Sequence, residues 1–231
     1  MALKKKNLAE SREKAKYLIK EGYVKVDGLI ITKPSKDVNE NSNIVLIKDF
    51  EFVSRGGYKL DSAVKHFKID FTDKIVADVG CSTGGFTDYA LKNGAKKVYA
   101  IDIGDAIHET LKKDERIVYF PNTDAKTIKS LDEKIDLCLI DVTFSPLEEI
   151  LLVVKKWLKD DGEVLGLIKP PFELSGKPKK NSDYDKCLEI AKKVSNWASE
   201  NGYELKGIVD SELKGKSSGQ QEFFIYLVLS Y

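Results

Sequence analysis

From about residue 56 onward, the chain alternates short apolar runs with amphipathic stretches. Near-continuous apolar runs of strand length are typical of strands that are buried on both faces. Such runs lie at 74–79, 97–102, 116–120, 134–142, 162–169, 203–211 and 222–230. Helical spacing recurs at 56–67, 106–112, 147–158 and 184–202, and in a stretch that ends at Leu91. The alternation predicts an α/β fold with a mostly parallel seven-stranded sheet and an antiparallel pair at its end.

The first 50 residues have a different pattern. Residues 8–22 read as one short helix, and "VKVDGLII" places Asp27-Gly28 between two apolar runs, which is a strong hairpin signal. A third strand is expected at 44–47, and few large apolar residues are available for a core. We therefore expect a small α+β domain over 1–50, a linker over 51–59 and the α/β domain over 60–231.

Composition narrows the class of protein. The formal net charge is only +1, but residues 4–25 carry eight basic residues against three acidic ones, so a locally basic face is expected. The three cysteines are scattered without CxxC spacing, which predicts neither a disulfide framework nor a metal site. No secretory signal follows the first lysines, and no run approaches the ~18 apolar residues of a membrane span. We expect a cytoplasmic protein without stable membrane association.

A glycine-rich turn, "GCSTGGF" at 80–86, follows the first strand of the α/β domain. It lacks the GK[ST] ending of a P-loop and the second glycine of the dinucleotide fingerprint. Asp78 lies at the end of the strand, where a pyrophosphate would be repelled, so a cationic ligand without phosphate is favoured. The alternative is that Gly80, Gly84 and Gly85 only let strand and helix pack closely.

Acidic residues end the next two strands. Asp102 follows the turn by about 20 residues, where a carboxylate can accept both hydroxyls of a ribose, and Asp124 can accept the exocyclic amine of a base. Together with the glycine turn, these two carboxylates predict a site for S-adenosylmethionine (SAM).

Two more charged residues, Asp141 and Lys169, are predicted at the carboxyl ends of the fourth and fifth strands. Ligands of open parallel sheets bind at this edge. A lysine that is withdrawn from water there can act as a general base. The alternatives are a solvated lysine at a strand end and an aspartate that caps a turn.

The chain resembles the TlyA family, in which a small S-four-like RNA-binding domain precedes an FtsJ-like 2′-O-ribose methyltransferase. The resemblance is carried by "SREKAKYLIKEGYVKVDG", "FVSRGGYKL", "DVGCSTGGFTD", "LIDVTFSPL", "LIKPPFE" and "GQQEFF". It implies a class I SAM-dependent methyltransferase fold, Rossmann-like, for the larger domain. It also implies a Lys-Asp-Lys-Glu tetrad, which falls on Lys59, Asp141, Lys169 and Glu222. Spacing alone would not have selected Glu222.

In this interpretation Lys169 is the general base that accepts the proton of the 2′-hydroxyl. Lys59 is expected to favour the neutral base and to bind phosphate or the hydroxyl, and the two carboxylates orient the lysines. The residues expected to bind SAM are Asp78, Gly80, Ser82, Thr83, Gly84, Gly85, Phe86, Asp102, Asp124 and Asp141. Those expected to bind RNA are Arg12, Lys14, Lys16, Lys20 and Arg55, whose charges can neutralise phosphates.

The resemblance implies ribosomal RNA or ribosomal subunits as partners and a cytidine as the target. Three departures from the family pattern stand out. The opening "MALKKKNLAESR" lacks the Arg-Leu-Asp-x-x-Leu stretch, so a shortened small domain is expected; "KPPFE" replaces Lys-Pro-Gln-Phe-Glu; and Asp124 stands where Asn is common. Two alternative functions remain open, a non-catalytic RNA-binding assembly factor and a membrane-active haemolysin.

Overall fold

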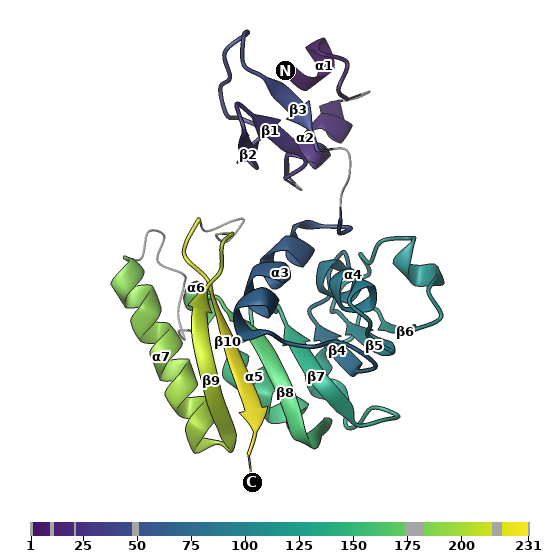
Figure 1. The fold of residues 1–231 in the computed structure, drawn as a ribbon, viewed down its shortest axis with the longest axis vertical. Coiled ribbons are helices and arrows are strands. Elements are labelled where there is room, and N and C mark those ends of the chain that lie inside the picture. Colours follow the sequence, from purple (N-terminus) through teal and green to yellow (C-terminus); the bar gives the residue numbers. More distant parts are fainter. Residues whose placement is uncertain are drawn as a thin grey trace. The chain divides into compact units, whose positions relative to one another are not determined.

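A computed structural model describes residues 2–9, 12–20, 22–47, 51–173, 183–213 and 219–230, without the side chains of 13, 14 and 17. The chain forms two compact units, Met1–Arg55 and Gly56–Tyr231 (Figure 1). Each unit has its own buried apolar cluster, so each is described by itself.

The N-terminal unit packs two helices on one small sheet. Helices α1 (Ala2–Lys5) and α2 (Arg12–Lys20) precede strands β1 (Val24–Val26), β2 (Leu29–Ile31) and β3 (Ile44–Leu46). The sheet is antiparallel in the order β2-β1-β3. Asp27 and Gly28 both have positive φ, 51° and 84°, which confirms the predicted hairpin. The Asp27 carboxylate also accepts the Asn43 amide at 2.8 Å, so the same residue ties the hairpin to the start of β3.

The larger unit contains one seven-stranded sheet. Its strands are β4 (Ile75–Val79), β5 (Lys97–Ile101), β6 (Ile117–Phe120), β7 (Ile135–Ile140), β8 (Leu158–Ile168), β9 (Tyr203–Asp210) and β10 (Phe223–Leu229). They lie in the order β6-β5-β4-β7-β8-β10-β9, and only β10 pairs in the antiparallel sense. The α/β class, the seven strands and the antiparallel pair at the end confirm the sequence prediction.

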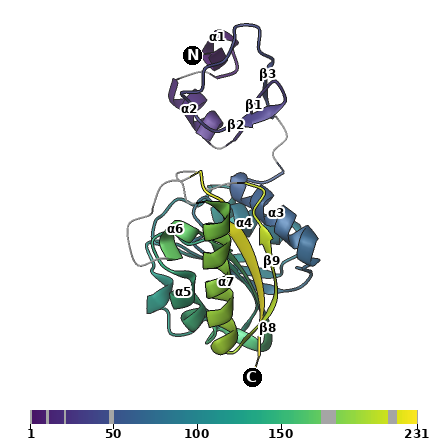
Figure 2. The ribbon, with the colours of Figure 1, turned by 90° about the vertical axis from the view of Figure 1, so that its left-hand side faces the viewer.

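Helices cover both faces of this sheet (Figure 2). Helices α3 (Arg55–Phe67) and α4 (Gly85–Lys92) lie on one face, and α5 (Leu147–Val154), α7 (Tyr184–Glu200) and the short α6 (Pro170–Glu173) lie on the other side. Side chains of β10 alternate accordingly. Phe224 packs against Phe86 of α4 and Tyr226 against Phe67 of α3, whereas Ile225 belongs to the cluster beneath α5 and α7.

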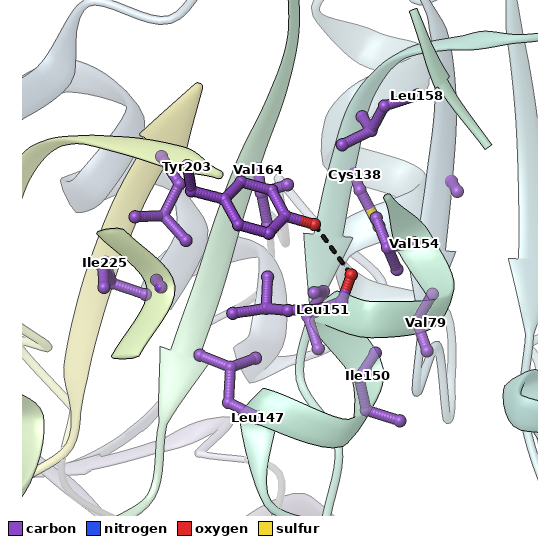
Figure 3. Packing of buried hydrophobic residues seen from close by; sticks show 14 of the residues in the cluster. Val79, Cys138, Leu147, Ile150, Leu151, Val154, Leu158, Val164, Tyr203 and Ile225 are labelled. Atoms are coloured by element: carbon purple, nitrogen blue, oxygen red, sulfur yellow. Dashed lines mark hydrogen bonds between the residues drawn. The ribbon is translucent and has the colours of Figure 1, made fainter. Parts of the chain in front are cut away.

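The cluster beneath α5 and α7 is the main core, and Tyr203 brings a buried hydroxyl into it (Figure 3). Tyr203 is 2% exposed, and its hydroxyl donates to the carbonyl oxygen of Leu151 at 2.7 Å. A buried hydroxyl without a partner would be costly, so this bond fixes how the start of β9 meets α5.

The structure differs from the sequence prediction in the 106–112 segment and at the start of α3. The helix expected at 106–112 is absent; only a 3₁₀ turn, η1 (Leu111–Lys113), forms there. Ile107 and Leu111 instead pack over Gly84, and the His108 amide donates to the Thr83 carbonyl. The glycine turn therefore holds the segment, and local backbone bonds form only at its end, where the Leu111 and Lys112 amides donate to the His108 carbonyl. In addition, α3 begins at Arg55, inside the segment expected to be a linker.

Candidate active site

The predicted site residues converge because of the strand order. The chain runs from β4 outward through β5 to β6, then returns to β7 on the other side of β4. At this switch point the helices after β4 and β7 leave in opposite directions, and a crevice opens at the carboxyl ends of the strands. A cleft of about 330 Å³ lies there, lined by segments that follow β4, β5, β6 and β7.

The glycine turn forms one wall of the cleft. Gly80 has φ +84°, and a Cβ atom there would lie 2.7 Å from the Asp141 carbonyl oxygen. Gly84 has φ +88° and caps α4 without a side-chain hydrogen bond. A side chain at Gly80 would therefore push the β7 end away from β4, so the turn is built for close backbone approach.

Asp102 and Asp124 line the opposite part of the cleft. Both oxygens of Asp102 accept backbone amides, from Ser82 at 2.8 Å and from Gly104 at 2.7 Å. Asp124 caps the 3₁₀ turn η2 (Ala125–Thr127) by accepting the Lys126 amide at 2.9 Å. Each carboxylate oxygen has a second lone pair, so both residues can still accept a hydroxyl or an amine.

Asp78 is buried completely and is not among the residues that line the cleft. One of its oxygens accepts the Thr87 hydroxyl at 2.6 Å, and the other, Oδ1, has no hydrogen-bond partner. Burial raises the pKa of Asp78 to about 7, the Thr87 hydroxyl opposes the rise, and the charges of Asp141 and Asp102 add to it. The negative charges of Asp102 and Asp141 therefore disfavour a further negative charge on Asp78 beside the glycine turn.

These features fit a SAM molecule. Several carboxyl groups close together favour a cationic ligand, and SAM carries a sulfonium and an ammonium. The glycine turn leaves room beside the backbone, and Asp102 and Asp124 line the same cleft with carboxylates that can accept hydroxyl or amine donors. The cleft volume falls within the range of ligand pockets.

Two lysine–carboxylate pairs lie beside the cleft. The Lys59 ammonium is 2.6 Å from Glu222 Oε2, and the Lys169 ammonium is 2.5 Å from Asp141 Oδ1. Lys169 also donates to the Thr143 hydroxyl at 3.0 Å. The exposed fractions of the side chains are 12% for each lysine, 6% for Glu222 and 22% for Asp141, so both pairs are largely removed from water.

The antiparallel direction of β10 brings Glu222 to this edge of the sheet. Phe223, its first residue, pairs with Ile168, the last residue of β8, so Glu222 and Lys169 are neighbours across the register. Burial raises the pKa of Glu222, and the Lys59 ammonium opposes this rise. The charges of Asp141 and Lys169 also act on Glu222. The structure thus gathers all four residues of the predicted tetrad from four separate segments.

Not every residue in the predicted cofactor set lines the cleft. Gly80, Ser82, Asp102, Asp124 and Asp141 do. Others belong to the turn and to α4 behind the cleft wall, namely Thr83, Gly84, Gly85 and Phe86. Their contribution to cofactor binding stays a prediction.

The predicted RNA-binding residues lie in two places. Arg12, Lys16 and Lys20 are exposed on α2 of the N-terminal unit, and the side chain of Lys14 lies outside the described residues. Arg55 is half-buried at the start of α3.

Sequence reasoning missed several cleft residues. Ile103 directly follows Asp102 and is 67% exposed; Phe144 lies two residues before Pro146, has φ +74° and is 79% exposed. Thr143 precedes Phe144 and contacts Lys169. Ile103 and Phe144 could have been found in the sequence, because each is a large apolar residue directly after a strand end or inside a polar turn. Such a residue gains nothing from burial there, so its presence indicates a binding surface.

Other kinds of site find little support in the described residues. Among them, no cluster of three metal-ligating side chains occurs, and no helix is long and apolar enough to cross a membrane. Cys81, Cys138 and Cys187 are buried free thiols.

Comparison with known families assigns both units. The FtsJ-like methyltransferase family matches residues 52–229, and the S4 domain family matches residues 1–44. The first match covers more than half of the chain and includes the entire cleft.

Relatives that align with this chain over most of their length support the match to the FtsJ-like methyltransferase family. YqxC of Bacillus subtilis, described as a candidate rRNA methyltransferase, is 35% identical. The alignment covers 97% of this chain and 83% of the YqxC chain. The 16S/23S rRNA (cytidine-2′-O)-methyltransferase TlyA of Mycobacterium tuberculosis is 33% identical, with 97% and 87% covered. A solved structure from Streptococcus thermophilus, described as a candidate hemolysin, aligns with a TM-score of 0.77 at 32% identity and covers 99% and 86%.

Proposed function

Because this chain belongs to the TlyA family, in which an S4 domain precedes an FtsJ-like methyltransferase domain, we propose that it methylates the ribose 2′-hydroxyl of a cytidine in ribosomal RNA. It is a SAM-dependent methyltransferase of class I fold. The observation that carries the proposed substrate chemistry is the meeting of two lysine–carboxylate pairs beside the cofactor cleft.

Different residues of the cleft would bind different parts of the cofactor. Bound SAM supplies an electrophilic methyl group on a sulfonium. The turn at Gly80 and Ser82 would hold the methionine part of the cofactor, Asp102 would accept the ribose hydroxyls, and Asp124 would accept the adenine amine; all of these residues line the cleft. Ile103 offers an apolar side chain for the adenine face.

Lys169 is the group that handles the proton. In its neutral form, its amine would accept the proton of the 2′-hydroxyl, whose oxygen would receive the methyl group that bound SAM supplies. Asp141 and the Thr143 hydroxyl hold the amine at the cleft edge. Because methyl transfer is an in-line displacement, alignment of hydroxyl, methyl and sulfur supplies much of the rate.

Lys59 and Glu222 form the second pair. Lys59 provides a positive charge for the substrate oxygen or the neighbouring phosphate, and Glu222 fixes its direction by a charge-assisted hydrogen bond. Phe144 lines the cleft and is exposed, and its ring centroid lies 5.4 Å from that of Phe172. It offers an aromatic surface for an unstacked base.

The N-terminal unit recruits the RNA. Exposed cations on α2 neutralise phosphates and release counterions, so binding depends on salt concentration. Such contacts read the shape and backbone of folded RNA, while the cleft selects the ribose. Ribosomal subunits in the cytoplasm are the corresponding partners.

The direct test is transfer of tritium from methyl-labelled SAM to purified ribosomal subunits and to naked ribosomal RNA. We expect RNA labelling by the wild-type protein and none by Lys169→Ala. Absence of transfer to any RNA would refute the proposed function. Full transfer by Lys169→Ala would refute the role of Lys169.

A further inference from the structure

The proposed reaction gives no role to Glu173, although this carboxylate lies four residues beyond Lys169 in "KPPFE". Its Oε2 accepts the backbone amide of Leu147 at 2.9 Å. Leu147 is the first residue of α5, so the bond joins the segment after β8 to the segment after β7. Those two segments carry Lys169 and Asp141 respectively.

The start of α5 needs such a partner. The residue at its N-cap is Pro146, which has no polar side chain, and no side-chain cap bond is formed there. The first amides of a helix have no partner within the helix, and a local Ser, Thr, Asp or Asn commonly accepts one. Glu173 supplies this acceptor from a different element.

The bond also fixes the far end of the loop that faces the cleft. That loop, residues 142–146, begins where the Asp141 amide donates to the Val79 carbonyl at 3.0 Å. It contains Thr143, which contacts Lys169, and its residues 142–145 line the cofactor cleft. With β4 holding one end and Glu173 the other, the position of Thr143 is set from both sides.

The connection from Glu173 back to Lys169 is short and stiff. Pro170 and Pro171 lie between the two residues and are both buried, and the Phe172 amide donates to the Lys169 carbonyl at 2.8 Å. The backbone of Lys169 lies close enough to Glu173 to stabilise its carboxylate. Because proline fixes φ, the distance between the Lys169 backbone and the Glu173 carboxylate has little freedom.

We propose that Glu173 is a positioning residue, which holds the 142–146 loop against the Lys169 segment and so sets the Lys169–Thr143 contact and one wall of the cofactor cleft. The inference rests on the proposed function for its effect on turnover. Its effect on the cofactor wall does not depend on which substrate is methylated.

The test compares Glu173→Ala, Glu173→Gln and the control Glu148→Ala, which removes a neighbouring carboxylate in the first turn of α5. S-adenosylhomocysteine affinity is measured by calorimetry, turnover with ribosomal subunits, and folding by thermal melting. We expect Glu173→Ala to weaken S-adenosylhomocysteine binding about fivefold and to lower kcat about tenfold or more, because small misplacements are costly in catalysis. Glu173→Gln, which keeps an acceptor oxygen, restores both to within about threefold, and Glu148→Ala changes neither.

A double variant separates positioning from general destabilisation. Thr143→Val is expected to lower kcat in the wild-type background and to have little further effect in Glu173→Ala, because the contact is already lost. Independent, multiplicative losses would overturn the proposal, as would wild-type affinity and kcat in Glu173→Ala. Should Glu173→Ala fail to fold, Glu173→Asp is used instead. Its side chain is one methylene shorter, so its carboxylate is drawn away from the Leu147 amide, and it must show the same losses of S-adenosylhomocysteine affinity and kcat.

If wild-type protein methylates no RNA, the proposed function fails, but the calorimetric comparison still decides whether Glu173 holds the cofactor wall.

Discussion

The two sides of the cleft are built in different ways. The cofactor side consists of backbone and short side chains. It contains glycines with positive φ, backbone amides that donate to Asp102, and the Asp124 carboxylate, which caps the turn that follows it. On the acceptor side, four charged side chains come from α3, from the residues directly after β7 and β8, and from the residue before β10. The first side comes from consecutive strand ends between residues 80 and 124, whereas the second joins segments as far apart in the chain as Lys59 and Glu222.

This difference has energetic consequences. Changes on the cofactor side act through backbone strain and through the space beside Gly80. Changes on the acceptor side remove one member of an ion pair that is mostly shielded from water, which leaves the other member without its partner. The first kind of change should affect cofactor affinity, and the second should affect turnover or stability.

Lys169→Met should give the largest effect. It removes the proton acceptor while keeping the apolar stem, so methyl transfer should fall about 10³-fold, within the range attributed to general base catalysis. S-adenosylhomocysteine affinity, measured by calorimetry, should change less than about threefold. A comparable loss of affinity would show that the two sides of the cleft are not separable.

Glu222→Ala should lower stability strongly, because it leaves Lys59 largely buried without its carboxylate. We expect the free energy of unfolding in urea to fall by about 3 kcal/mol. The control Lys206→Ala breaks an exposed pair with Glu204 and should cost about 0.5 kcal/mol or less. Equal effects would mean that burial of the Lys59–Glu222 pair does not matter.

Gly80→Ala tests the cofactor side of the cleft, which consists largely of backbone. The new Cβ would meet the Asp141 carbonyl, and the positive φ would be strained. Gly94→Ala is the matched control: its φ is +98°, but its Cβ would make only an ordinary contact at 3.4 Å with Thr72. We expect about 1 kcal/mol of destabilisation for Gly94→Ala and about 3 kcal/mol for Gly80→Ala, with loss of S-adenosylhomocysteine binding only in the latter. Similar stability losses would contradict the close approach of β4 and β7.

The raised pKa of the buried Asp78 carboxyl predicts how the free energy of unfolding depends on pH. Burial raises the pKa of Asp78 to about 7, so the folded protein retains a proton that the unfolded chain releases at its ordinary pKa of 3.8. The free energy of unfolding should therefore fall as pH rises from about 4 to 7, by at most about 1.4 kcal/mol per pH unit for this group. Burial raises the pKa of Glu173 to about 7 as well, which adds a slope of the same sign. Urea unfolding at several pH values should show a shallower slope for Asp78→Asn; an unchanged slope would contradict the raised pKa.

The smallest effect concerns the exposed cations of the N-terminal unit. Changing Arg12, Lys16 and Lys20 together to glutamine should weaken RNA binding about tenfold at ~0.1 M salt and make its salt dependence shallower. A triple change of Lys186, Lys192 and Lys193 on α7 removes the same charge from another surface and serves as the control. Equal losses in filter binding would assign the effect to net charge alone.

The sequence predicted most of the fold, because strand and helix periodicity are local. It failed at 106–112, where apolar side chains pack on the glycine turn instead of forming a helix. The meeting of Gly80, Asp102 and Asp124 at one cleft was also predictable, since each lies shortly after an apolar strand of a parallel sheet. Glu222 was accessible only through family resemblance, because its place depends on the antiparallel register of β10 with β8. Thr143 and Glu173 were missed for a similar reason: their partners lie in another element.

Identification of the methylated atom tests the central claim most directly. Ribosomal RNA is methylated by wild-type protein, digested to nucleosides and analysed by mass spectrometry, with Lys169→Met in parallel. The account predicts 2′-O-methylcytidine for the wild type and none for the variant. A methyl group on a base nitrogen or carbon, or 2′-O-methylcytidine formed equally by the variant, would contradict it.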